Sequence, residues 1–144
     1  MNIMAARIAD LDALAQLDSE VIGDTSRRNY IEKAISHENC IIVKEDNEIA
    51  GFLVYDRNFF DCAFIALIIV SKSKRRMGYA SELLHYMADH SPTQKIFSSA
   101  NQSNYSMQQV FKSNGFVKSG VVENLDDGDP EIIYYRLKKG SNLK

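Results

Sequence analysis

The stretch of sequence that decides the fold reads FIALIIV at residues 64–70, followed by RRMGYA at residues 75–80. Seven apolar residues in a row, rich in β-branched side chains and too short to cross a membrane, predict a strand buried on both faces. After the basic turn, apolar residues recur at helical spacing, which predicts a helix that begins at about Gly78 and packs one face on the sheet. The stretch therefore predicts a buried strand, a tight basic turn and a helix in direct succession.

The turn before this helix has the chemistry of a phosphate site. The first amides of a helix have no carbonyl partner within it, and Gly78 has no Cβ to keep a ligand away from them. The helix dipole favours an anion there by up to about 2 kcal/mol, and Arg75 and Arg76 add full positive charges. The alternative is a solvated basic turn that only caps the helix.

The spacing Arg75-x-x-Gly78-x-Ala80 resembles the Gln/Arg-x-x-Gly-x-Gly/Ala signature of the GCN5-related N-acetyltransferase (GNAT) family. In that family the turn holds the pyrophosphate of acetyl coenzyme A (acetyl-CoA), the acyl donor, and strand backbone meets its pantetheine arm. The resemblance implies that cofactor-binding residues lie at the end of the strand and in the turn. They are Ile68, Ile69, Val70, Arg75, Arg76, Met77, Gly78, Tyr79, Ala80 and Ser81.

The rest of the chain predicts an α/β (α+β) fold. After a short strand at 7–10, helices are predicted over 11–21 with Asp10 as cap, 26–37, 78–90 and 104–114. Strands are predicted over 40–44, 49–55, 64–70, 95–99, 116–123 and 131–137, and a frayed tail over 138–144. This order is that of the same family. It implies one N-acetyltransferase domain over 1–144, with a mixed, mostly antiparallel sheet that is flanked by helices and splayed at the cofactor site.

Composition narrows the class of protein and its partners. The chain has 144 residues, of which 45% are hydrophobic and 25% charged, and its net charge is -2. That charge gives no general attraction to nucleic acid or to an anionic membrane, and no apolar run approaches the roughly 20 residues of a membrane span. We therefore expect a cytoplasmic protein with no nucleic-acid or membrane partner. Cys40 and Cys62 lack metal-ligand spacing, so neither a metal nor a disulfide is expected.

A further match lies in the last predicted helix, with Ser103 as its expected cap. Asn104-x-x-Met107-x-x-Val110-Phe111-x-x-x-Gly115-Phe116 is similar to the family's Asn-x-x-Ala-x-x-Leu-Tyr-x-x-x-Gly-Phe. In the family the asparagine hydrogen-bonds the cofactor, which implies cofactor contacts for Asn104 and Phe111. The alternative is that Asn104 is an ordinary polar residue of a first helical turn.

The catalytic residues of the family do not carry over to this chain. Phe111 stands where the family usually has a tyrosine that protonates the leaving thiolate, and a phenyl ring has no proton to donate. Ala66 and Ser99 occupy strand positions where relatives often carry a glutamate base. The catalytic residues are therefore left unassigned. Substitute proton donors, for which ordinary packing is the alternative, are Tyr105, Tyr134 and Tyr135.

The turn between the last two predicted strands is acidic. In relatives this hairpin borders the acceptor site, so the resemblance implies acceptor binding by Asp126, Asp127 and Asp129; a solvated turn is the alternative. The expected function is acetyl-CoA-dependent transfer of an acetyl group to a primary amine of a small cationic molecule or peptide. The alternative function is an acyl-CoA-binding sensor with little catalytic activity. Relatives often form dimers, so the resemblance is compatible with a homodimer.

Overall fold

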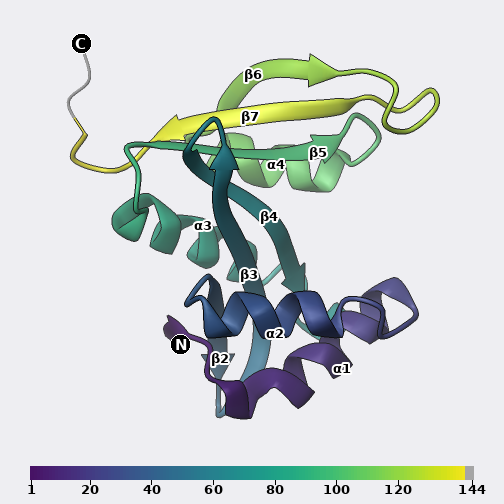
Figure 1. Cartoon of the computed structure of the whole chain (residues 1–144), viewed down its shortest axis with the longest axis vertical. Coiled ribbons are helices and arrows are strands. Elements are labelled where there is room, and N and C mark those ends of the chain that lie inside the picture. The colour runs from purple at the N-terminus through teal and green to yellow at the C-terminus, as the bar shows by residue number, and fades with distance from the viewer. Residues whose placement is uncertain (142–144) are drawn as a thin grey trace. The chain divides into compact units, whose positions relative to one another are not determined.

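The predicted α/β class is confirmed in the computed structural model, which describes residues 1–141 (Figure 1). Seven strands form a mixed sheet in the order β1-β2-β3-β4-β5-β7-β6, flanked by helices. β4 and β5 pair in parallel, whereas β1 with β2, β2 with β3, β5 with β7 and β6 with β7 pair antiparallel. The described chain packs as two compact units. The first holds residues 1–55 and 67–83, and the second holds residues 56–66 and those from 84 onward.

The strands and helices have the following bounds. The strands are β1 (Asn2–Ala5), β2 (Cys40–Glu45), β3 (Glu48–Phe59), β4 (Cys62–Val70), β5 (Lys95–Asn101), β6 (Val117–Val122) and β7 (Glu131–Leu137). The α-helices are α1 (Leu11–Ile22), α2 (Arg28–Ser36), α3 (Tyr79–His90) and α4 (Tyr105–Ser113). Two short 3-10 helices are η1 (Ile8–Asp10) and η2 (Lys72–Lys74).

The start of the chain corrects one prediction. The first strand lies earlier than expected, because residues 8–10 form η1 and the strand β1 ends at Ala5. Asp10 is followed by α1, but its carboxylate caps η1 instead: the amide of Arg7 donates to Asp10 Oδ2 at 2.8 Å. An acidic side chain three residues after an N-cap reaches back to that amide, and this geometry turns Asp10 away from the amides of α1.

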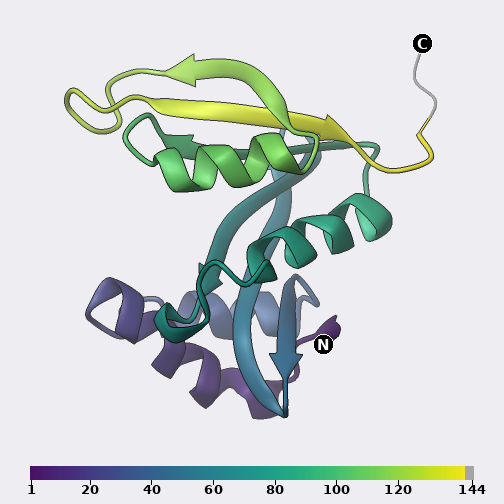
Figure 2. The ribbon, with the colours of Figure 1, turned by 180° about the vertical axis from the view of Figure 1, so that it is seen from behind.

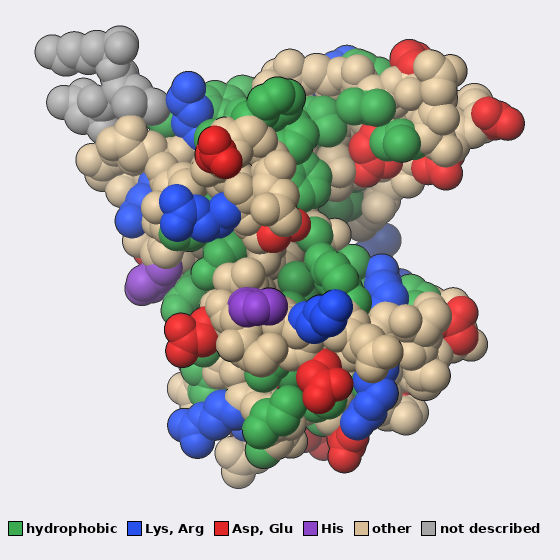
Figure 3. All heavy atoms as spheres, viewed as in Figure 1, with side chains coloured by type: hydrophobic (Ala, Val, Ile, Leu, Met, Phe, Trp, Pro, Cys, Tyr) green, Lys and Arg blue, Asp and Glu red, His purple; other side chains and the backbone are tan. Residues whose placement is uncertain are grey.

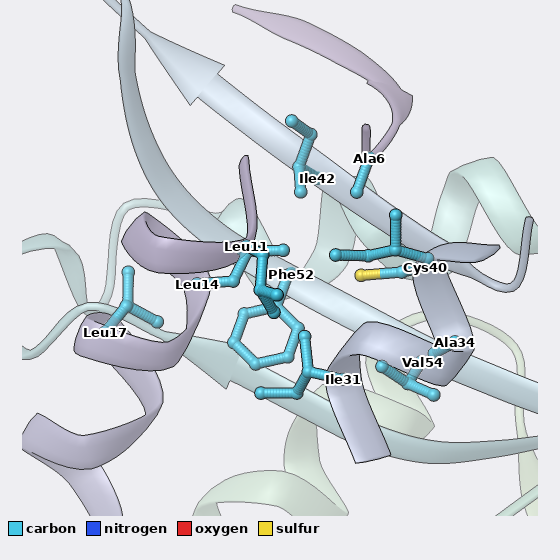
Figure 4. Close-up of a cluster of buried hydrophobic side chains, with 11 residues drawn as sticks. Ala6, Leu11, Leu14, Leu17, Ile31, Ala34, Cys40, Ile42, Phe52 and Val54 are labelled. Atoms are coloured by element: carbon cyan, nitrogen blue, oxygen red, sulfur yellow. The ribbon is translucent and has the colours of Figure 1, made fainter. Parts of the chain in front are cut away.

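The first unit has its own hydrophobic core beneath α1 and α2 (Figure 4). Phe52 of β3 is 0% exposed and lies among Leu14 of α1 and Ile31 of α2, which are also 0% exposed. A charged pair also joins α1 to the start of α2. The guanidinium of Arg27 donates to both oxygens of the buried Asp18 carboxylate, at 3.0 and 2.6 Å. Such a bidentate ion pair is stronger than a single neutral hydrogen bond, and it also fixes the orientation of the two side chains.

A buried thiol in this core makes the stability of the protein depend on pH. Burial, and to a lesser extent the charge of Asp10, raises the pKa of Cys40 from 9.0 to about 12. Between these values the unfolded chain loses the thiol proton and the folded chain keeps it. The free energy of unfolding therefore falls as pH rises, by about 1.4 kcal/mol per pH unit from this group.

Cys40→Ala is expected to remove that contribution. In urea unfolding at pH 8 to 11, the variant should lose stability less steeply than the wild type does above pH 9. Burial also raises the pKa of Tyr79 and of Tyr134, but both phenols are present in the two proteins and cancel in the comparison. Parallel stability curves for the two proteins would contradict the assignment.

The second unit is built around the strands β5, β7 and β6, with α4 covering one face (Figure 2). Phe111 of α4 is 1% exposed, and its ring lies 5.0 Å from that of Tyr134 in β7 and 5.3 Å from that of Phe116. The opposite face carries apolar side chains that are only half-buried (Figure 3). Rings in contact there are those of Phe59, Phe64, Phe97 and Tyr135.

Two further predictions are corrected in part. The run over 64–70 forms a strand, but it is not buried on both faces: Ile65 is buried, whereas Ile68, Ile69 and Val70 are half-buried. The tail does not fray at Lys138, because the amide of Lys138 donates to Gln94 O and that of Lys139 to Ala88 O, each at 2.7 Å. Residues 142–144 of the predicted tail lie outside the described residues.

Candidate functional site

The basic turn of the first unit leads directly from β4 into α3. η2 follows Ser71, and the chain then takes left-handed conformations at Arg76 (φ 65°) and at Gly78 (φ 87°). A Cβ added at Gly78 would meet no protein atom within 4 Å, so the space in front of this residue is open. Glycine adopts such a conformation without the steric cost that other residues meet, which explains why this position carries one.

The start of α3 presents amides and positive charge at the same place. The first hydrogen bond of the helix runs from the amide of Glu82 to Gly78 O at 3.0 Å. The amides that come before it are those for which an α-helix offers no carbonyl within itself. Arg75, Arg76 and Met77 are exposed around them, and Met77 is 61% exposed. This arrangement of donors and cations fits the chemistry of a diphosphate.

Tyr79 holds the start of α3 against the first unit. The side chain is 5% exposed, and its hydroxyl donates to Glu45 Oε2 at the end of β2, at 3.4 Å. Burial, followed by the negative charge of Glu45, raises the pKa of this phenol. Because the phenol ring is packed inside, Tyr79 has only its backbone to offer to a ligand at the turn.

The end of β4 lies tightly against β3. A Cβ added at Gly51 of β3 would come within 2.7 Å of Ile69 O and within 3.3 Å of Val70 Cγ2. The amide of Ser71 donates to Ala50 O at 2.8 Å, just after the last residue of β4. These contacts set the position of the β4 residues from which the turn begins. Among the predicted site residues, the first unit thus brings together residues 68–70 and 75–81.

The other predicted site residues lie in the second unit. In this unit β4 and β5 form a parallel pair over three positions. These are Ala63 with Ile96, Phe64 with Phe97, and Ile65 with Ser98. The hydroxyl of Ser98 donates to Ile65 O at 2.8 Å at the last of these pairs. Beyond it, β5 continues over Ser99–Asn101 and pairs with β7.

Asn104 caps α4, and this corrects the expectation that Ser103 would do so. The side-chain oxygen of Asn104 accepts a hydrogen bond from the amide of Met107 at 3.1 Å. The hydroxyl of Ser103 donates instead to Asp129 Oδ2 at 2.6 Å. Because the hydroxyl of Ser103 is bonded to Asp129 of the acidic loop, the next residue, Asn104, caps α4 instead.

The three candidate tyrosines have different surroundings. Tyr134 is 2% exposed and stacks on Phe111, the residue in the position of the family's tyrosine. Tyr135 contacts Phe97 on the opposite face of the sheet, with ring centroids 5.4 Å apart. Tyr105 is 74% exposed at the start of α4. The second unit therefore brings only Tyr134 next to Phe111.

The acidic loop between β6 and β7 gathers carboxylates at one end of the second unit (Figure 3). Two of its three predicted acceptor-binding residues are tied to the end of β5 and to the turn before α4. Asp129 accepts from both the amide and the hydroxyl of Ser103, at 2.9 and 2.6 Å, and Asp126 accepts from Asn101 Nδ2 at 2.9 Å. Asp127 is exposed beside them.

Sequence reasoning missed one pair of polar residues in this unit. The hydroxyl of Ser99 in β5 donates to Glu131 Oε2 in β7 at 2.7 Å. The sequence showed only a serine in a strand and a glutamate at the edge of an acidic turn. Because the pairing register of two distant strands decides this contact, no local signal could have revealed it.

Comparisons with known proteins agree with the family resemblance. The model of the acetyltransferase (GNAT) family matches residues 8–116. A solved GNAT-family acetyltransferase from Bacillus cereus ATCC 10987 is 64% identical, with 95% of this chain and 96% of that chain covered and a TM-score of 0.93. A search among curated proteins found no significant match. None of the described helices is both long and apolar enough to pass through a membrane.

More distant solved structures share the fold. The ribosomal-protein-S18-alanine N-acetyltransferase of Escherichia coli is 19% identical, with 99% of this chain and 98% of that chain covered and a TM-score of 0.81. The protein yncA of Salmonella typhimurium, solved with acetyl-CoA, is 13% identical, with 99% of this chain and 96% of that chain covered and a TM-score of 0.79. From the family model and the Bacillus cereus relative, the chain belongs to the GNAT family of acetyltransferases, enzymes that transfer an acetyl group from acetyl-CoA.

Proposed function

We propose that this enzyme holds acetyl-CoA at the turn over 75–81 and acetylates a primary amine of a small cationic molecule or peptide. The single observation that carries the proposal is the open space at Gly78 beside two exposed arginines at the start of α3. Amides and guanidiniums there would bind the diphosphate, and acetyl-CoA would supply an activated acetyl group as a thioester. Backbone groups of Ile68, Ile69 and Val70 would bind its pantetheine arm, since the β4–β5 pairs of the described residues end at Ile65, before these positions.

In the second unit, Asn104 and Phe111 are the proposed cofactor contacts. The oxygen of the Asn104 side chain is used in capping α4, so its amide NH₂ is the group left to donate to the cofactor. We place the acyl end of the donor past the last β4–β5 pair, beside Ser99. The proton donor to the leaving thiolate stays open among Tyr105, Tyr134 and Tyr135: Tyr134 contacts Phe111, whereas Tyr135 lies on the same face of the sheet as Ser99.

Two kinds of amine are compatible with the proposal. Solved proteins of this fold include a spermidine N-acetyltransferase chimera and ribosomal-protein-alanine N-acetyltransferases. These share only the fold with this chain, so they suggest which amines to test. The acidic loop favours a cationic acceptor, since carboxylates attract and orient ammonium groups.

The decisive measurement is release of the coenzyme A thiol from acetyl-CoA in the presence of single amines. The panel contains spermidine, an aminoglycoside, a peptide that begins with alanine and a peptide with an internal lysine. We expect amine-dependent release with at least one of them. Tight coenzyme A binding with no release on any amine would instead favour the acyl-CoA-binding sensor.

Asp127→Asn tests the acceptor end. Asp126 and Asp129 also fasten the loop, through hydrogen bonds from Asn101 and Ser103. The exposed Asp127 is therefore the carboxylate whose neutralisation disturbs the fold least. Exposed charge pairs contribute under about 1 kcal/mol, so the KM for a cationic amine should rise by up to about fivefold. The affinity for coenzyme A should not change. An unchanged KM would reject the role of this residue.

The proposal also covers the extent of the domain, the location of the protein and its oligomeric state. One N-acetyltransferase domain over 1–144 is supported by the family model, which matches most of that range. The cytoplasmic location is supported by the composition and by the absence of a long apolar run in the sequence. The homodimer is proposed from the resemblance to the family, whose members often form dimers.

A further inference from the structure

The proposed reaction needs a group that removes a proton from the acceptor. Amines of the lysine type are ammonium ions at neutral pH, with an ordinary pKa of about 10.4, and only the neutral amine has a lone pair for attack. A positioned base typically contributes about 10²–10⁴ in rate. The strand positions of Ala66 and Ser99 supply no such base. The question is which carboxylate of the chain can act in their place.

The Ser99–Glu131 pair places a carboxylate beside one of these two positions. In the β5–β7 ladder, Ser99 is opposite Ile133 and Asn101 is opposite Glu131. Ser99 and Glu131 are therefore diagonal neighbours on one face of the sheet, and the 2.7 Å hydrogen bond joins them across it. Both side chains are half-buried, whereas the neighbouring Ser98 is 2% exposed and faces the other way. The pairing register therefore places the carboxylate of Glu131, in β7, next to the β5 position of Ser99, where relatives often carry a glutamate.

The pair also lies at a defined point of the sheet. The last β4–β5 pair joins Ile65 and Ser98, so Ser99 is the first residue of β5 beyond that ladder. Among the described residues, the hydroxyl of Ser99 donates to the Glu131 carboxylate, and it takes only one of the two oxygens. Asp126 and Asp129, by contrast, accept hydrogen bonds that fasten the loop. Of these three carboxylates, Glu131 is the one held in a strand.

We propose that Glu131 is the general base of this enzyme and that Ser99 is a positioning residue that aims its carboxylate; the proposal rests on the proposed function above. Glu131 takes one proton from the acceptor ammonium, which leaves a neutral amine. The nitrogen lone pair then forms the C–N bond to the acetyl carbon as the C–S bond breaks. A second amine proton ends on the departing sulfur, and Glu131 returns its proton to water.

The test is Glu131→Gln, assayed with the best amine of the panel. Glutamine keeps an oxygen that can accept from Ser99, so the strand contact is retained while the base is lost. At pH 7, kcat/KM should fall about 10²–10⁴-fold. The deficit should shrink as pH approaches the pKa of the amine, because more of the amine then arrives neutral. A purely structural defect would lower the rate by the same factor at every pH.

Matched variants separate the roles. Calorimetry should give Glu131→Gln the coenzyme A affinity of the wild type within about twofold, and Glu32→Gln, which neutralises an exposed carboxylate of α2, should keep wild-type kinetics. Ser99→Ala should cost less than Glu131→Gln, with the same dependence on pH. Ser99→Glu added to Glu131→Gln should recover part of the rate, because it returns a carboxylate to the same face of β5.

The two levels of the hypothesis fail in different ways. A wild-type protein that binds no coenzyme A overturns the proposed function itself. A Glu131→Gln enzyme that binds coenzyme A and keeps wild-type kcat/KM across the pH range overturns only the assignment of the base. A deficit that does not change with pH also overturns that assignment.

Discussion

Gly78→Asp is expected to weaken coenzyme A binding ten- to hundredfold, or by about 1.4–2.8 kcal/mol. The substitution places a side chain in the open space in front of the α3 amides and adds a negative charge where a diphosphate is proposed to bind. The new carboxylate would compete for the same amides and for the charge of Arg75 and Arg76. Calorimetric titration with coenzyme A measures the effect directly.

The control must separate the lost ligand site from the strain of a non-glycine residue in a left-handed conformation. Gly23 offers a match, since it has φ 92° and a Cβ there would also meet nothing within 4 Å. It ends α1 and has no proposed part in binding. Gly23→Asp should therefore lose similar stability and keep its coenzyme A affinity. Equal affinity losses in the two variants would remove the phosphate turn from the proposal.

Gly51→Ala is expected to lower the free energy of unfolding by about 1–3 kcal/mol, the usual cost of overfilling a packed site. The added methyl group would lie 2.7 Å from Ile69 O, and because that atom belongs to the backbone it cannot rotate away. β3 and the end of β4 must move apart instead. A lower urea midpoint with an unchanged m-value is the expected result.

Gly120→Ala is the matched control for this substitution. Gly120 also lies in a strand, and a Cβ there would meet no atom within 4 Å. Alanine at such a site is neutral or slightly stabilising, because it reduces the conformational freedom of the unfolded chain. If both variants unfolded at the same urea concentration, the close approach of β3 to β4 would not be a constraint on the fold.

Local sequence patterns were sufficient to predict most helices and strands and the basic turn before α3. The run over 64–70, the basic turn and the apolar stripe of α3 are contiguous, so their order follows from neighbouring residues. The two errors in helix capping occurred where two local preferences compete. Asp10 could cap either η1 or α1, and Ser103 or Asn104 could cap α4, and in both cases a contact outside the expected helix decided the outcome.

The sequence by itself determined the fold class, the family and the chemistry of the turn at Gly78, because these depend on residue types at fixed short spacings. Only the tertiary structure decided which side chains of distant segments meet. It buried Tyr79 against Glu45, stacked Tyr134 on Phe111 and joined Ser99 to Glu131. The pairing register of β5 and β7 sets the last of these contacts, and a shift of one residue would turn one of its two side chains to the other face of the sheet.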